Sequence, residues 1–175
     1  FLVSVLETDV DRVIVNSKST YETVLEYLKK IGKENVEVVL NENEDLTQMH
    51  DIAGQVEEMK ERKIWLKCGG FITIDKTEAL TAIDINSGKF TGKKNSSKEN
   101  TIYKVNQEAT VEIAKQLRLR NISGIIVIDY IDMEEEQDRK NIMNLLEKEL
   151  KKDRSKTQIM GFTKLDLLEM TRKKL

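Results

Sequence analysis

The residues best placed to do chemistry are two aspartates and an asparagine at predicted strand ends. Apolar and polar residues alternate over 81–86, so Asp84 and Asn86 point to one face of a strand while isoleucines fill the other. Asp129 ends an apolar strand over 124–129, which is where open α/β sheets present functional groups. Oxygen ligands without cysteine or histidine suit Mg²⁺, with Mn²⁺ as the alternative, and such ions bind through one or two carboxylates plus a substrate phosphate. The pattern therefore predicts a metal site for phosphate chemistry, with Asp84 and Asp129 as its ligands.

Spacing alone also allows a plainer interpretation, in which Asp84 and Asp129 are charged strand ends that bind nothing. Asp132 shows the same ambiguity, because Asp132 and Glu135 form a capping-box-like pair before a charged helix. We interpret Asp132 as a helix cap first and as an outer partner of the metal second.

The elements that must position these residues fall into two blocks. In the first block, residues 12–16 and 36–40 are predicted strands on either side of a helix, which gives a β-α-β unit. A capping box that starts at Ser19 opens this helix, and Gly32 closes it. A second helix is predicted over 46–62, so we expect this block to be scaffold.

The second block is richer in strands. Its predicted elements are strands at 64–68, 71–75 and 77–86, a flexible basic loop at 87–100, an amphipathic helix around 102–117, a strand at 124–129, a charged helix at 134–151, and strands at 157–161 and 165–170. Asp75 and Glu78 flank a hairpin turn and receive no primary role. The apolar run before Asp129 predicts a strand buried on both faces. The predicted class is α/β, with mixed sheets flanked by helices.

Composition narrows the classes of chemistry. The 175 residues suffice for one domain or two small lobes, and no apolar run is long enough to cross a bilayer, so no membrane span is expected. The chain begins with Phe1 and lacks the pattern of a signal peptide, so we expect a segment of a larger protein. The chain has one cysteine, Cys68, which excludes an internal disulfide and a multi-cysteine zinc site and suits the reducing cytoplasm. It has one histidine, His50, so catalytic triads and metal sites that need histidine are poorly supplied. Catalysis must therefore depend on carboxylates.

Charge is distributed unevenly along the chain. Residues 1–62 contain 7 basic and 14 acidic residues, whereas residues 63–175 contain 22 basic and 17 acidic ones. A polyanion should therefore engage the second block. The candidate cations are Lys89, Lys93, Lys94, Arg118 and Arg120, although a solvated basic surface explains each of them equally well.

Five segments of the chain resemble the bacterial ribonuclease E/G family, in the order and spacing of that family. They are residues 69–87, with the sequence GGFITIDKTEALTAIDINS, then 106–109, 116–120, 126–133 and 167–172. The resemblance implies a deoxyribonuclease I-like catalytic subdomain at 63–175, preceded by part of a ribonuclease H-like subdomain at 1–62.

The same resemblance implies roles for the residues singled out above. Asp84 and Asp129 match the two magnesium-binding aspartates of the family, and Asn86 matches the asparagine that orients the scissile phosphate. The family cleaves single-stranded, AU-rich RNA with a metal-activated water and leaves a 5′-phosphate on the downstream product. The implied function is thus a cytoplasmic hydrolase of RNA processing and decay, an endoribonuclease.

Parts of the family pattern are missing from these residues. The RNA-binding barrel and the 5′-end sensor are not recognisable, and the cysteine motif that shares zinc between subunits is absent, so a homo-oligomer is expected only of the full-length parent. Aromatic residues make up 5% of the chain, which predicts few surfaces for base stacking and a weak, salt-sensitive grip on RNA.

Three functions remain open at this point. The first is a magnesium-dependent endoribonuclease core that cleaves single-stranded RNA. The second is a non-catalytic structural or RNA-contacting fragment, inactive without the rest of the enzyme. The third is a different metal phosphoesterase that acts on DNA or on a small phosphate ester.

Overall fold

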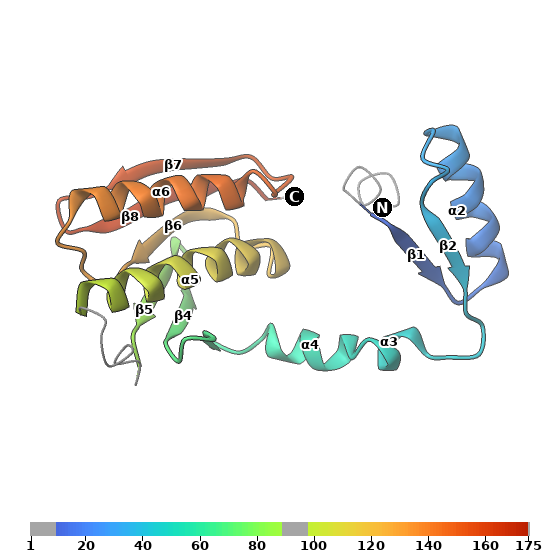
Figure 1. Ribbon diagram of the computed structural model, residues 1–175, viewed down its shortest axis with the longest axis horizontal. Helices are drawn as coiled ribbons and strands as arrows, with labels where there is room; N and C mark the ends of the chain where they lie inside the picture. The colour runs from blue at the N-terminus through green and yellow to red at the C-terminus, as the bar shows by residue number, and fades with distance from the viewer. Residues whose placement is uncertain (1–9, 89–97, 175) are drawn as a thin grey trace. The chain divides into compact units, whose positions relative to one another are not determined.

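The computed structural model describes residues 10–88 and 98–174, and the chain divides into two compact units, Phe1–Glu58 and Met59–Leu175 (Figure 1). The mixed α/β class predicted from the sequence is confirmed. The assignment of 1–62 and 63–175 to named subdomains stays a prediction. Within the described residues, no helix is long and apolar enough to cross a membrane.

The first unit contains the predicted β-α-β arrangement. Strand β1 (Arg12–Val15) pairs in parallel with β2 (Glu37–Leu40), and helix α2 (Lys18–Lys30) connects them. A small core forms where the inward faces of these elements meet; its buried members are Val15, Val24, Leu28 and Val36.

The ends of α2 are set by local hydrogen bonds. The helix starts two residues earlier than predicted, because the Ser17 hydroxyl, rather than that of Ser19, accepts a 3.3 Å hydrogen bond from the Thr20 backbone N–H. At the other end Gly32 has a φ of 69°, and the Lys33 N–H donates to the Leu28 carbonyl at 3.0 Å. This closing turn satisfies a terminal carbonyl, as a left-handed glycine cap does, and it confirms the predicted stop.

The single helix predicted over 46–62 is wrong. The structure has two short helices, α3 (Leu46–Met49) and α4 (Ile52–Glu58), separated by Asp51 with a φ of 47°. The Gln55 side chain donates to the His50 carbonyl at 2.8 Å. In a continuous helix, a backbone N–H one turn later would have donated to this carbonyl instead.

The second unit is built on one six-stranded sheet in the order β3-β4-β5-β6-β8-β7. Its elements are β3 (Lys63–Trp65), β4 (Phe71–Lys76), β5 (Leu80–Asn86), α5 (Lys98–Leu119), β6 (Gly124–Asp129), α6 (Glu136–Leu150), β7 (Thr157–Phe162) and β8 (Leu167–Arg172). The β5–β6 pair is parallel and α5 is its crossover, whereas the other pairs are antiparallel.

Helices α5 and α6 pack together and cover one face of this sheet (Figure 1). Val105, Ala109, Ile113 and Leu117 are fully buried along α5, as their helical spacing predicts. We call the face that the helices leave uncovered the open face.

The prediction that the strand before Asp129 is buried on both faces is wrong. Ile126 and Ile128 are fully buried under the helices, but Ile125 is 52% exposed on the open face. The helices that the structure describes in this unit, α5 and α6, cover the other face of the sheet, so they do not cover Ile125 and its alternate neighbours on β6.

The last strand is anchored by a buried ion pair. The Arg172 guanidinium donates to Asp153 at 2.7 and 3.2 Å, and also to the Asn121 side chain and the Ile122 carbonyl, both at 2.9 Å. The side chains of Arg172 and Asp153 are 0% and 2% exposed. This network joins the end of β8 to the loops before β6 and after α6.

We expect Arg172→Ala to lower the free energy of unfolding by about 3–5 kcal/mol, because it leaves a buried carboxylate without its partner. Urea unfolding followed by circular dichroism measures this. Lys140→Ala, which removes an exposed ion pair with Glu136 on α6, should change stability little. Equal effects of the two substitutions would contradict the assigned role of Arg172.

The same pair predicts an acid-sensitive contribution to stability. Burial raises the pKa of the Asp153 carboxyl, but hydrogen bonds from Arg172 and the Ser155 backbone N–H outweigh it, so the net pKa lies below the ordinary value of 3.8. A depressed pKa stabilises the fold above the unfolded pKa and loses that effect as pH falls through the folded pKa. We therefore expect the difference in unfolding free energy between wild type and Asp153→Asn to be constant at pH 5–7, and to shrink below about pH 3.8. A difference that did not change with pH would contradict this.

Candidate metal centre

Asp84 and Asp129 lie beside each other at the ends of two parallel strands. They are register partners in the β5–β6 pair, so their Cα atoms are roughly 5 Å apart. Ile83 and Ile85 are buried under the helices, at 1% and 4% exposure, so Asp84 projects from the opposite, open face. The alternation seen in the sequence is thus realised as two neighbouring carboxylates.

Asn86 extends this group by one side chain. Its Nδ2 donates to Asp84 Oδ2 at 2.6 Å, which holds one carboxylate oxygen in place. An amide nitrogen carries two N–H groups, so one remains to donate to another oxygen. The structure therefore brings together all three residues predicted to do chemistry.

The carboxylates form a patch of negative charge. Burial first, and then the charges of Asp84 and Asp132, raise the pKa of the Asp129 carboxyl. Like charges at this spacing destabilise the doubly ionised state, and a cation between them would remove that penalty.

The donor set fits a hard divalent cation. Asp84 and Asp129 offer carboxylate oxygens, and Mg²⁺ is commonly held by one or two carboxylates while it retains several waters. Residues 10–88 and 98–174 contain no cluster of three or more histidine, cysteine, aspartate or glutamate side chains arranged to hold a metal. A site with two protein carboxylates suits Mg²⁺ or Mn²⁺ better than it suits zinc, which favours four protein ligands or three with a water.

Helix α5 fixes the segment that follows Asp129. The fully buried Asn106 side chain donates to the Ile131 carbonyl at 2.8 Å and accepts from the Ile131 N–H at 3.2 Å. One turn later, the hydroxyls of Thr110 and Tyr130 lie 3.0 Å apart in a hydrogen bond. Tyr130 and Ile131, which directly follow Asp129, are thereby tied to one helix.

Helix α5 also fixes the turn between β3 and β4. The Glu108 carboxylate accepts hydrogen bonds from the backbone N–H groups of Lys67 and Cys68. Gly70 in this turn lies directly against β5, because a Cβ added there would be 2.8 Å from the Asn86 carbonyl oxygen. A larger residue at 70 would therefore displace the backbone of Asn86.

Two interpretations of single residues are corrected. Asp132 does not cap α6, because the helix starts at Glu136 and its N-cap is Glu135, without a side-chain cap bond. The charge of Asp132 contributes to the raised pKa of the Asp129 carboxyl, and its role as an outer partner of a metal stays a prediction. Cys68 lies in the turn after β3 rather than in a strand, and burial raises the pKa of its thiol, which does not favour a nucleophile.

The predicted RNA-binding cations fall in different places. Arg118 donates to the Glu149 carbonyl at 3.3 Å, and Arg120 donates to the Gln116 side chain at 2.7 Å and to the Glu61 carbonyl at 2.9 Å. Both arginines are at the end of α5 that leads into the start of β6, so they lie at the opposite end of that strand from Asp129. Lys89, Lys93 and Lys94 lie outside the described residues. Their role in RNA binding stays a prediction.

Sequence reasoning missed a bidentate pair on the open face. Arg62 donates to the two Asp75 oxygens at 2.5 and 2.6 Å, and its pKa is raised mainly by Asp75 and to a smaller extent by the charge of Asp84. The sequence analysis had placed Arg62 at the end of a helix. Counting the β3–β4 hairpin back from its Gly69-Gly70 turn would have put Arg62 next to the strand instead.

Comparison with known proteins shows the family of this chain. The sequence model of the Ribonuclease E/G family matches residues 1–175. The chain is 43% identical over 170 residues to Ribonuclease G of Salmonella typhimurium, covering 96% of this chain and 34% of that protein. It is 42% identical over 170 residues to Ribonuclease G of Escherichia coli K12, with the same coverage of 96% and 34%.

A similar relation holds for ribonuclease E. The chain is 36% identical over 173 residues to Ribonuclease E of Escherichia coli K12, covering 97% of this chain and 16% of that protein. The chain thus spans about a third or less of the length of these relatives. The match extends over the whole chain, and the chain belongs to the ribonuclease E/G family.

Proposed function

We propose that this chain is the metal-binding catalytic part of an endoribonuclease that cleaves single-stranded RNA. The observation that carries the proposal is the register pairing of Asp84 with Asp129 on the open face, with Asn86 hydrogen-bonded to Asp84. Relatives of this chain are named Ribonuclease G and Ribonuclease E, which supports RNA rather than DNA or a small phosphate ester as the substrate.

Each of the three side chains has a distinct task. Asp84 and Asp129 hold Mg²⁺, or Mn²⁺ in its place, and when bound the ion supplies an activated water and offsets negative charge on the phosphate. The Asn86 amide keeps Asp84 in one orientation and offers its second N–H to a phosphate oxygen of the RNA. By its resemblance to the family, we expect hydrolysis to leave a 5′-phosphate on the downstream product.

The rest of the unit keeps these groups rigid. Burial of Ile83, Ile85 and Ile128 fixes the two strand ends, and the hydrogen bonds of Asn106 and Glu108 fix the chain on either side. Rigid strands hold catalytic groups more accurately than loops do. The proposal therefore places the metal centre in this chain and leaves most of the RNA grip to other parts of the natural protein.

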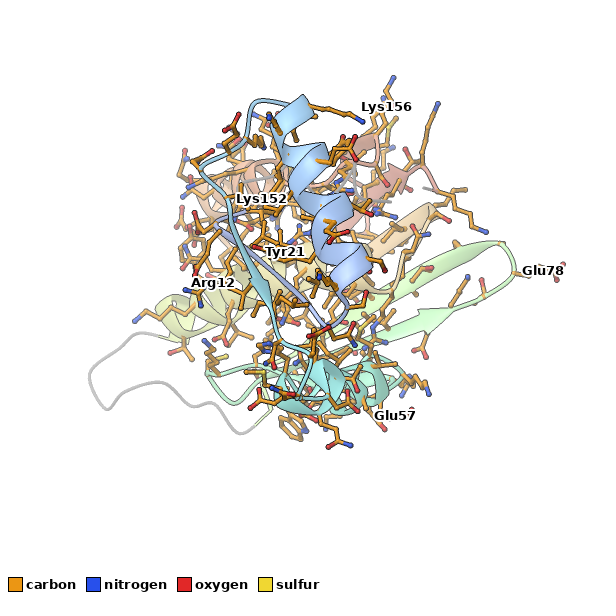
Figure 2. The ribbon with its side chains drawn as sticks, turned by 90° about the vertical axis from the view of Figure 1, so that its right-hand side faces the viewer. Arg12, Tyr21, Glu57, Glu78, Lys152 and Lys156 are labelled. Carbon is orange, nitrogen blue, oxygen red and sulfur yellow. The ribbon has the colours of Figure 1, made fainter. Side chains whose placement is uncertain are left out.

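Metal binding is the first test, and it needs no RNA. We expect this chain to bind Mn²⁺, detected by electron paramagnetic resonance, and Mg²⁺ to compete with it. Asp84→Asn and Asp129→Asn should each weaken Mn²⁺ binding at least about tenfold, since each removes a ligand. Glu78→Gln is the matched control, because Glu78 is exposed at the tip of the β4–β5 turn (Figure 2). If Glu78→Gln weakened binding as much as the aspartate substitutions did, the assigned site would be wrong.

Cleavage is the second test, and it uses the natural protein. We expect Mg²⁺-dependent cutting of a 5′-monophosphorylated single-stranded RNA, and Asp84→Asn or Asp129→Asn should reduce the rate by at least about 100-fold. Asn86→Ala should reduce it by roughly 10- to 1,000-fold, as expected when a donor to the reacting phosphate is lost. Rates are followed by gel electrophoresis of end-labelled RNA.

Two results would count against this function. Unchanged cleavage by both aspartate variants would show that the metal centre lies elsewhere. Equal cleavage of a DNA of matched sequence would favour a broader phosphoesterase.

A further inference from the structure

An aromatic pair lies on the open face beside the candidate metal centre: half-buried Phe71 on β4, next to β5, and exposed Trp65 on β3, one strand further. Trp65 is the register partner of Phe71, and Phe71 is the register partner of Asn86. The two rings are 5.3 Å apart between centroids and inclined by 62°. The sheet thus continues from Asn86 across Phe71 to Trp65 in a single row.

Lys63 adds a positive charge to this pair. Its Nζ lies 4.0 Å from the centroid of the Trp65 ring and 3.6 Å from that of Phe71. Lys63 also belongs to the row of the metal centre, because it pairs with Thr73, which in turn pairs with Asp84. A cation and two rings are thus held together within two rows of the same sheet.

Trp65 contributes little hydrophobic burial to the stability of the fold in this position. Its side chain is 65% exposed, whereas Ile64 on the same strand packs against the core under the helices. An exposed tryptophan that is held by a neighbouring ring and a lysine is pre-ordered without being buried. Such an arrangement suits the capture of a flat ligand better than it suits core packing.

The distance to the metal centre suits a neighbouring nucleotide. β3 lies two strand spacings from β5, so Trp65 is roughly 10 Å across the sheet from Asn86. From a phosphate at Asp84 and Asp129, an adjacent base of the same strand would be within reach of the Trp65 ring. Every base has a π-face, so stacking of this kind tolerates different sequences.

We propose that Trp65 and Phe71, together with the Lys63 ammonium, form a stacking platform for an unpaired nucleobase of RNA whose phosphate is held at the metal centre. This proposal rests on the proposed function and deepens it. Trp65 supplies the stacking surface, Phe71 supports the ring edge-on, and Lys63 offers charge to the phosphate backbone. The sequence analysis predicted few stacking surfaces, and here one adjoins the reacting groups.

The chain contains a single tryptophan, so its fluorescence reports on residue 65 alone. A short, uniformly 2′-O-methylated single-stranded oligonucleotide, titrated with Mg²⁺ present, should quench this fluorescence, and gel electrophoresis checks that the oligonucleotide stays intact. An abasic oligonucleotide of the same length keeps the phosphates and loses the bases, so it should quench little. Equal quenching by the two oligonucleotides would overturn the platform.

Variants test the residues separately, with anisotropy of a labelled oligonucleotide as the readout. Trp65→Leu should weaken binding by roughly 5- to 100-fold and Trp65→Phe by less, because phenylalanine keeps a ring. Lys63→Gln should weaken binding. It should also make the slope of log affinity against log salt concentration shallower by about 1, because one fewer phosphate charge is neutralised. Met160→Ala removes an exposed apolar side chain at the opposite edge of the sheet and should leave affinity unchanged. Circular dichroism confirms that each variant folds.

The outcomes separate this proposal from the proposed function. Base-dependent quenching without metal-dependent cleavage would support the platform and count against the nuclease. Normal cleavage with no quenching, or with unchanged affinity in Trp65→Leu, would overturn the platform and leave the nuclease in place. Emission that shifts with protein concentration rather than with nucleobase would assign Trp65 to a protein contact, and that too would overturn the platform.

Discussion

The repulsion between the Asp84 and Asp129 carboxylates is the constraint around which the second unit is organised. Two negative charges on adjacent strands would separate if the backbone allowed it. It does not, because the parallel β5–β6 pairing fixes their register, and buried isoleucines on the covered face anchor both strands. Hydrophobic burial on one side of the sheet therefore holds an unfavourable charge pair on the other. A bound cation would relieve this repulsion, which is why we propose the charge pair as the metal centre.

Helix α5 has more than one role in this arrangement. It makes the crossover that parallel strands require, and its apolar stripe forms much of the core. Its polar side chains also reach the two loops that border the site, through Asn106 on one side and Glu108 on the other. A change in the position of α5 would therefore move both borders of the metal centre together.

Local patterns predicted the parts of the site that depend on alternation. The order Ile83, Asp84, Ile85, Asn86 determines which side chains share a face, and the apolar run before Asp129 identifies a strand end. Features that depend on distant contacts were not predictable. The break at Asp51, the exposed face of β6 and the pairing of Arg62 with Asp75 follow from which segments meet in space. Nothing near Trp65 in the sequence shows that it occupies the open face of an edge strand.

Both margins of the six-stranded sheet leave backbone groups unpaired, which in other proteins invites chains to join edge to edge. Here β3 is only 3 residues long, and β7 has a register irregularity between Ile159 and Gly161. Neither margin offers a long, flat run of donors and acceptors to another copy. A short edge strand and an irregular one are features that discourage edge-to-edge pairing, and they flank a sheet face that α5 and α6 leave uncovered.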